Sequence, residues 1–120
     1  MKNAIRIIIE EMANAPDGIK VGVVMPTIRD EVRLTRELAD SLINTDLAGC
    51  FPRVVNAYTM APFEGFYCYH ILIVDGDRMN NLEEVIRKAK CRAEHCTLIW
   101  SETREEIDCR TRFEEMWGKS

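Results

Sequence analysis

The segment of residues 70–74, HILIV, constrains the fold more than any other part of the chain. Its aliphatic residues follow one another without polar alternation, as is typical of a strand buried on both faces of a parallel sheet. Residues 21–25 have the same character, a weaker strand is predicted at residues 53–57, and the last strand is predicted at residues 97–100. We therefore expect a sheet whose strongest strands lie in its interior.

Amphipathic helices are predicted before, between and after these strands, because apolar residues recur there at helical spacing. The apolar positions are Ile5, Ile8, Ile9 and Met12 in residues 4–13; Val32, Leu34, Leu38, Leu42 and Ile43 in a helix that runs to about residue 43; Leu82, Val85, Ile86 and Ala89; and Ile107, Phe113, Met116 and Trp117 in a final helix. The predicted caps are Thr27 with Asp30 in capping-box spacing, Asn80 or Asn81, and Ser101 or Thr103 with Glu106.

Strands that alternate with amphipathic helices predict an α/β fold. We expect a three-layer sandwich with a mostly parallel sheet of about four or five strands. The 120 residues are the size of one domain, so we expect residues 1–120 to form a single α/β domain.

The composition limits which partners and which cellular location we expect for the protein. The net charge of −4 argues against a protein that coats nucleic acid, although it does not exclude a local basic patch. No apolar run approaches the roughly 20 residues that a bilayer span needs, so no membrane partner is expected. The apolar residues 7–9 run directly into Glu10 and Glu11, which is unlike a signal peptide. These features favour a cytoplasmic protein.

The cysteines are consistent with the expected cytoplasmic location. They are Cys50, Cys68, Cys91, Cys96 and Cys109, an odd number with no C-x-x-C pair. Reduced thiols are therefore expected rather than a disulfide framework. A metal site of Cys91, His95, Cys96 and Cys109 is the alternative, but its spacing matches no common zinc motif.

Polar residues follow three of the predicted strands. They are Pro26-Thr27, Asp75-Gly76-Asp77 and Ser101-Glu102-Thr103. Each is also explained without a ligand, the first and last as helix starts and the second as a turn. Ligands of open α/β sheets nevertheless bind beyond the carboxyl ends of strands. If Arg78 and Arg104 converge at that edge, they could bind a phosphate or an acidic partner together with Thr27, Ser101 and Thr103.

The order and spacing of these motifs resemble the core of helicase and phage-terminase ATPases. The segment VGVVMPTIR is similar to their strand and Pro-Thr-Arg step, ILIVDGDRM resembles their Walker B strand with Asp75 at the aspartate position, and TLIWSETR is similar to their Ser-Ala-Thr motif. The resemblance implies a RecA-like, P-loop-NTPase-like scaffold. It covers nearly the whole chain, at the level of motifs.

The chain also departs from that pattern. It contains no G-x-x-x-x-G-K-[ST] segment, which cradles the phosphates in such enzymes, and it begins where that loop would already have ended. Position 76 is a glycine where the resemblance places the water-polarising glutamate, and glycine cannot act as a base. A second motor domain, with its trans-acting arginine, is missing too. The resemblance therefore implies a reduced, degenerate relative that kept the scaffold, of a kind that a phage or mobile element would encode.

Other chemistries remain open at the same residues. Asp75 and Asp77 fit the opening motif of haloacid-dehalogenase-type phosphatases or the aspartate pair of glycosyltransferases, although the position in the chain and its length argue against both. The pair could also hold Mg²⁺ alone, since carboxylates suit hard cations. Catalysis by a cysteine and a histidine has little support, because His70 and His95 lie near the amino ends of their strands.

An aromatic segment offers a surface for a partner. The residues are Phe63, Phe66, Tyr67 and Tyr69, which either cap one end of the sheet or form an exposed anchor for a protein. Trp100 is expected in the core. Trp117 is assigned either to helix packing or to a contact between two copies of the chain. The second assignment would make the protein a homo-oligomer.

Three functions follow, in order of preference. The first is a non-catalytic interaction or regulatory protein with a protein partner and no cofactor. The second is a small Mg²⁺-dependent phosphotransfer or hydrolytic enzyme centred on Asp75 and Asp77. The third is a nucleic-acid accessory factor, which the net charge does not favour.

Overall fold

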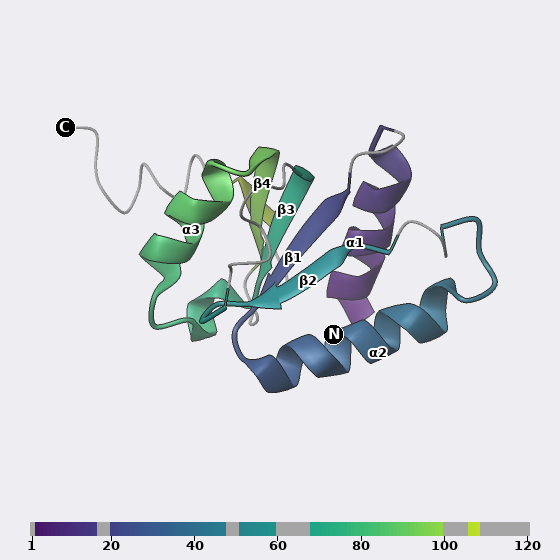
Figure 1. Cartoon of the computed structure of the whole chain (residues 1–120), viewed down its shortest axis with the longest axis horizontal. Coiled ribbons are helices and arrows are strands. Elements are labelled where there is room, and N and C mark those ends of the chain that lie inside the picture. Colours follow the sequence, from purple (N-terminus) through teal and green to yellow (C-terminus); the bar gives the residue numbers. More distant parts are fainter. Residues whose placement is uncertain (1, 17–19, 48–50, 60–67, 100–105, 109–120) are drawn as a thin grey trace.

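A sheet of parallel strands forms the middle layer of the fold (Figure 1). The computed structural model describes residues 2–16, 20–47, 51–59, 68–99 and 106–108. The strand order is β2-β1-β3-β4-β5. The strands are β1 (Val21–Met25), β2 (Arg53–Asn56), β3 (Cys68–Val74), β4 (Ala93–Ile99) and β5 (Glu106–Asp108). The first four are parallel to their neighbours, and the short β5 pairs antiparallel with β4.

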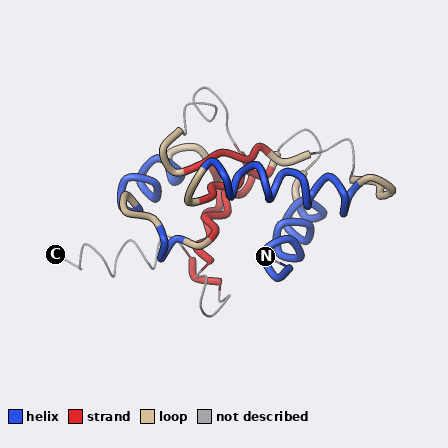
Figure 2. Tube along the Cα trace, turned by 90° about the horizontal axis from the view of Figure 1, so that it is seen from below, coloured by secondary structure: helices blue, strands red, loops and turns tan. Residues whose placement is uncertain are grey.

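Helices cover both faces of the sheet. They are α1 (Lys2–Asn14), α2 (Ile28–Leu42) and α3 (Leu82–Lys90). Apolar residues of α1 and α2 pack against one face and those of α3 against the other, which gives two core clusters. Figure 2 shows the strands between α3 on the left and the helices of the opposite face. The predicted three-layer α/β sandwich is therefore confirmed.

The interior strands are buried as predicted. Ile71, Leu72, Ile73 and Val74 are all fully buried, and β1 is buried along its whole length. Alternate residues of β3 enter different clusters, with Ile71 facing α3 and Leu72 facing α1 and α2. Two helical faces explain why these strands lack polar alternation.

The predictions for two strands and for the final helix need correction. The central strand begins at Cys68 and the fourth at Ala93, both earlier than expected. Tyr69 and His70 interrupt the apolar run of β3, and the first residues of β4 are partly or fully exposed. The final helix is wrong at Glu106–Asp108, which form β5. There Ile107 pairs with Leu98, so pairing with a neighbouring strand overrides the local capping signal. The remainder of that predicted helix, with Phe113, Met116 and Trp117, lies outside the described residues.

The apolar side of α2 is narrower than predicted. Leu34, Leu38 and Leu42 are buried, whereas Val32 is 50% exposed and Ile43 is 71% exposed. On α1, Ile7 is buried although it was not in the predicted stripe. Ile5 and Ile9 pack only partly buried against the cluster. None of the helices in the described part of the chain has both the length and the apolar character needed to cross a membrane.

Candidate functional site

The carboxyl edge of β1 and β3 is where the topology places a ligand site. The chain leaves β1 toward β2 and leaves β3 toward β4, so the connections diverge between these two adjacent strands. Side chains that follow both strands meet at such a switch point. Thr27 and Asp30 follow β1, at the start of α2, and Asp75 and Arg78 follow β3.

Arg78 connects the two strand ends. Its guanidinium lies 3.4 Å from Oδ2 of Asp30 and 3.4 Å from Oδ2 of Asp75. Both carboxylates are buried, whereas the arginine side chain is 49% exposed and covers them from the solvent side. Burial of two carboxylates is unfavourable unless a cation is nearby. Arg78 is therefore the local counter-ion of this edge, which weakens its capacity to bind a phosphate.

Thr27 caps α2 and belongs to the same network. Its Oγ1 accepts a hydrogen bond from the amide of Asp30 at 3.2 Å and donates one to Oδ2 of Asp30 at 2.9 Å. The predicted capping arrangement is confirmed. Asp30 was predicted only as part of this cap, and its ion pair with Arg78 is new. That pair depends on which strands are neighbours, so no local spacing could have indicated it.

The backbone turns sharply after β3. Asp75 has φ 55° and ψ 45°, the left-handed conformation, and is the single non-glycine residue with positive φ in the described chain. Aspartate tolerates this region better than most residues. The next residues, Gly76–Arg78, form one turn of 3-10 helix, closed by the Arg78 amide donating to the Asp75 carbonyl at 2.9 Å. This turn directs Arg78 back over the strand ends.

Gly76 is packed against the core. A Cβ atom at this position would lie 2.5 Å from Cδ1 of Leu98 and 3.2 Å from Cδ1 of Leu82. Leu98 is fully buried and cannot move aside without disturbing its neighbours. A side chain at position 76 would therefore require Leu98 to shift within the packed core.

Asp75 and Asp77 differ in exposure. Asp75 is buried beneath Arg78, whereas Asp77 lies exposed on the 3-10 turn. No cluster of three or more His, Cys, Asp or Glu side chains suited to a metal ion occurs in the described ranges. The acidic partner of Asp75 at this edge is Asp30, through Arg78.

A second network extends the edge toward β2. Asn56 donates through Nδ2 to Oε1 of Glu31 at 3.0 Å, and its Oδ1 accepts from the amide of Tyr58 at 2.9 Å. Asn81 donates to the carbonyl of Ala57 at 2.9 Å. These bonds fix β2 against the starts of α2 and α3.

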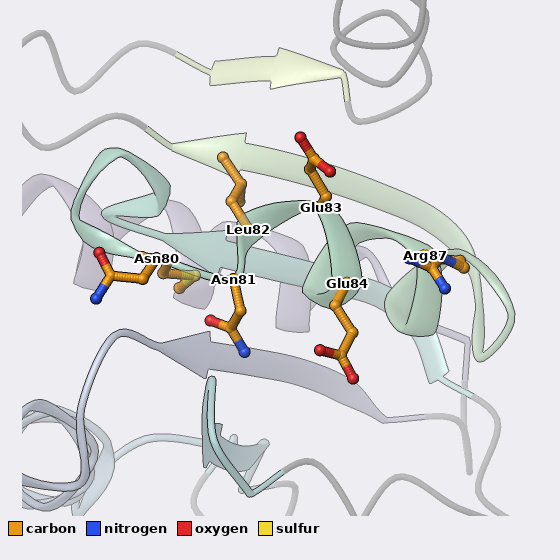
Figure 3. Close-up of a pocket in the computed structure, with 7 residues that line it drawn as sticks. Asn80, Asn81, Leu82, Glu83, Glu84 and Arg87 are labelled. Carbon is orange, nitrogen blue, oxygen red and sulfur yellow. The ribbon is translucent and has the colours of Figure 1, made fainter.

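A shallow pocket of roughly 450 Å³ lies at the start of α3 (Figure 3). Asn81 and Glu84 project on one side of the helix start and Leu82 and Glu83 on the other. Asn81 is the N-cap but makes no side-chain capping bond, and its Oδ1 is buried without a hydrogen-bond partner in the described structure. The residues that line the pocket are Met79, Asn80, Asn81, Leu82, Glu83, Glu84 and Arg87.

Several predicted contact residues lie outside the described residues. They are Ser101, Thr103 and Arg104 of the binding set, and Phe63, Phe66 and Tyr67 of the aromatic set. Tyr69 is described, and it lies half-buried in β3 with its ring edge against His95 at a centroid distance of 5.0 Å. It is therefore near the amino end of its strand, away from the carboxyl edge.

His70 forms a further polar cluster at that opposite end. Its Nδ1 is 2.9 Å from Oε2 of Glu11 on α1, and its Nε2 is 2.7 Å from Oγ1 of Thr97 on β4. The ring is largely buried, and buried polar atoms need hydrogen-bond partners. These two contacts give each ring nitrogen a partner. Sequence analysis placed His70 at this edge but did not identify either partner.

Cys68, Cys91 and Cys96 are reduced thiols in the described structure, and Cys50 and Cys109 lie outside the described residues. Burial raises the pKa of Cys68 from 9.0 to about 11, partly offset by the positive charge of Arg53. The alternative metal site is not assembled among its described members. Cys96 packs toward the α3 core, whereas the ring of His95 contacts Tyr69 and His70.

Comparison of the chain with protein-family models, curated proteins and solved structures found no match. The candidate site therefore has to be interpreted from its own geometry.

Proposed function

We propose that this chain is a non-catalytic interaction or regulatory protein on a scaffold related to P-loop ATPases. The observation that carries the proposal is the packing of Gly76 against Leu98. The resemblance places a water-polarising glutamate at position 76, and a side chain there would require the buried Leu98 to shift. The glycine is thus part of the core, and hydrolysis would need a base from elsewhere.

The state of Asp75 supports the same proposal. In the ATPases that the chain resembles, the corresponding aspartate faces a nucleotide-bound metal ion. Here the carboxylate is buried and paired with Arg78. A metal ion would have to displace the arginine and reach a largely inaccessible group. The edge is thus better suited to holding the fold together than to exchanging a ligand.

Isothermal titration with ATP and Mg²⁺, together with a phosphate-release assay, tests the proposal. We expect neither micromolar binding nor turnover. Micromolar affinity accompanied by turnover that Asp75→Asn abolishes would contradict it. A Glu83→Gln variant is the matched control, because it removes one carboxylate from the exposed start of α3 and leaves the Asp30–Arg78–Asp75 network intact.

A second candidate is a small Mg²⁺-dependent phosphotransfer or hydrolytic enzyme. It is favoured by one observation, that the carboxylates of Asp30 and Asp75 lie at the ends of two adjacent strands, although Mg²⁺ would have to displace Arg78 from them. Paired carboxylates at such an edge suit Mg²⁺. A screen of phosphate esters with Mg²⁺ and Mn²⁺ tests this candidate, which requires activity that is lost in both Asp30→Asn and Asp75→Asn.

A further inference from the structure

The outer face of α2 carries three arginines that point away from the core. Arg29, Arg33 and Arg36 are all exposed, and at 100° per residue they lie within about 60° of one another around the helix axis. They span about 10 Å along the helix. We name this row of residues the arginine stripe.

The arginine stripe has no charge partner in the described structure. The ion pairs there involve Arg6, His70, Arg78 and Lys88, and none includes a member of the stripe. Glu31 is held by Asn56 on the side toward β2. The exposed Asp40 lies in the same sector, one helical turn beyond Arg36. The three arginines and this aspartate together leave the face with a local positive charge, on a chain whose net charge is −4.

Apolar side chains flank the arginine stripe. Ile28 is 67% exposed and Val32 is 50% exposed, and they lie one helical turn apart. Two branched aliphatic residues spaced by four positions are suited to packing against the apolar row of another helix. Arginine beside exposed apolar residues is also a combination enriched in protein interfaces.

We propose that this face of α2, formed by Ile28, Val32 and the arginine stripe, binds an acidic amphipathic helix of a partner protein. The inference rests on the proposed interaction function and names the surface and the chemistry of its partner. Leucine-like residues of the partner pack on Ile28 and Val32, and its carboxylates pair with the arginines.

A nucleic acid fits this face less well than a protein does. Aliphatic side chains add little to phosphate binding, which depends on neutralising the backbone. Charge complementarity and the apolar pair together favour an acidic helix.

The experiment uses a synthetic peptide of about three heptads with leucine at the a and d positions and glutamate at e and g. Fluorescence anisotropy of the labelled peptide with the full chain should show binding that weakens between about 50 and about 500 mM NaCl. The triple variant R29Q/R33Q/R36Q should weaken binding by about tenfold or more, since each lost charge pair contributes modestly. Ile28→Ser with Val32→Ser should also weaken it, at either salt concentration.

Two controls make the result specific. The triple variant R87Q/K88Q/K90Q removes the same charge from α3 and should leave the affinity within about twofold. A peptide with glutamine in place of glutamate should bind poorly. Circular dichroism checks that each variant is folded.

Other outcomes overturn the inference. These are no binding of the acidic peptide, equal loss in both triple variants, tighter binding of a DNA duplex of about 20 base pairs, or self-association that the stripe variant abolishes. Detection of ATP turnover in the same preparation would instead contradict the proposed function, so the two failures can be told apart.

Discussion

Gly76 and Leu98 are packed so closely that a single added methyl group at residue 76 would overlap the leucine side chain. The two residues come from the turn after β3 and from β4, and the register pairs Ile73 with Leu98 just before the turn. The turn that presents Arg78 is therefore anchored through its glycine to the neighbouring strand.

Gly76→Ala should lower the free energy of unfolding by about 1–3 kcal/mol, because the added Cβ overpacks a filled core. Urea denaturation measures this loss. Asn80→Ala, at an exposed position nearby, should change stability by no more than about 0.5 kcal/mol. Combining Gly76→Ala with Leu98→Ala should destabilise less than the sum of the single changes, since the smaller side chain makes space. Additive losses would argue against the contact.

Replacing Asp75 by glycine should lower the free energy of unfolding less than replacing it by alanine. Both changes remove the pair with Arg78, but alanine also carries the strain of the left-handed conformation, about 1–2 kcal/mol. The difference between Asp75→Gly and Asp75→Ala in thermal unfolding measures that strain. A larger loss for glycine would indicate that the conformation at residue 75 is not left-handed.

Arg78→Met should destabilise the fold by about 1–3 kcal/mol, because the buried carboxylates of Asp30 and Asp75 lose their counter-ion. Asp30→Asn keeps an oxygen for Thr27 while it removes the charge. A double-mutant cycle between Arg78→Met and Asp30→Asn should give a coupling of at least about 0.5 kcal/mol. A coupling near zero would mean that Arg78 covers the edge without interacting with Asp30.

The raised pKa of Cys68 predicts that the folded chain loses stability at alkaline pH. Its thiol has a pKa of about 11 in the folded chain against an ordinary value of 9.0, so folding favours the neutral form. This contribution is fully present below pH 9 and is lost as the pH rises toward 11. The difference in unfolding free energy between the native chain and Cys68→Ala should fall across that window, by on the order of 2–3 kcal/mol at most.

Thiol reactivity gives an independent measure of the same property. At pH 8, a disulfide reagent should modify the exposed Cys91 well before Cys68, since the thiolate is the reactive form. Cys91→Ser identifies the fast phase. If Cys68 reacted as fast as Cys91 in the folded chain, neither its burial nor its raised pKa would be supported.

The interior of the fold could be predicted from sequence because burial on two faces leaves a strong pattern. Residues 21–25 and the core of β3 were identified in this way, and so was the cap formed by Thr27 with Asp30. The starts of β3 and β4 were missed, since residues such as Tyr69 and His95 interrupt the apolar pattern of these strands. The strand at Ile107 was missed because Thr103 and Glu106 carry a helix-start signal, which pairing with β4 overrides.

Only part of the candidate site could be predicted from the sequence. Asp75 and Arg78 were identified because they follow the strongest strand. Their connection to Asp30 requires β1 and β3 to be neighbours, and that order is a property of the whole sheet. The exposure of Val32 and Ile28 could not be predicted either, because a helical apolar pattern does not say how much of it the sheet covers.

The place of β2 in the sheet has a consequence for solubility. Within the described residues, β2 pairs with β1 on one side and with no strand on the other, and α2 runs beside it. Unpaired main-chain groups along such a strand can recruit strands of other molecules and start aggregation. The chain should therefore be prone to aggregate at high concentration through this edge.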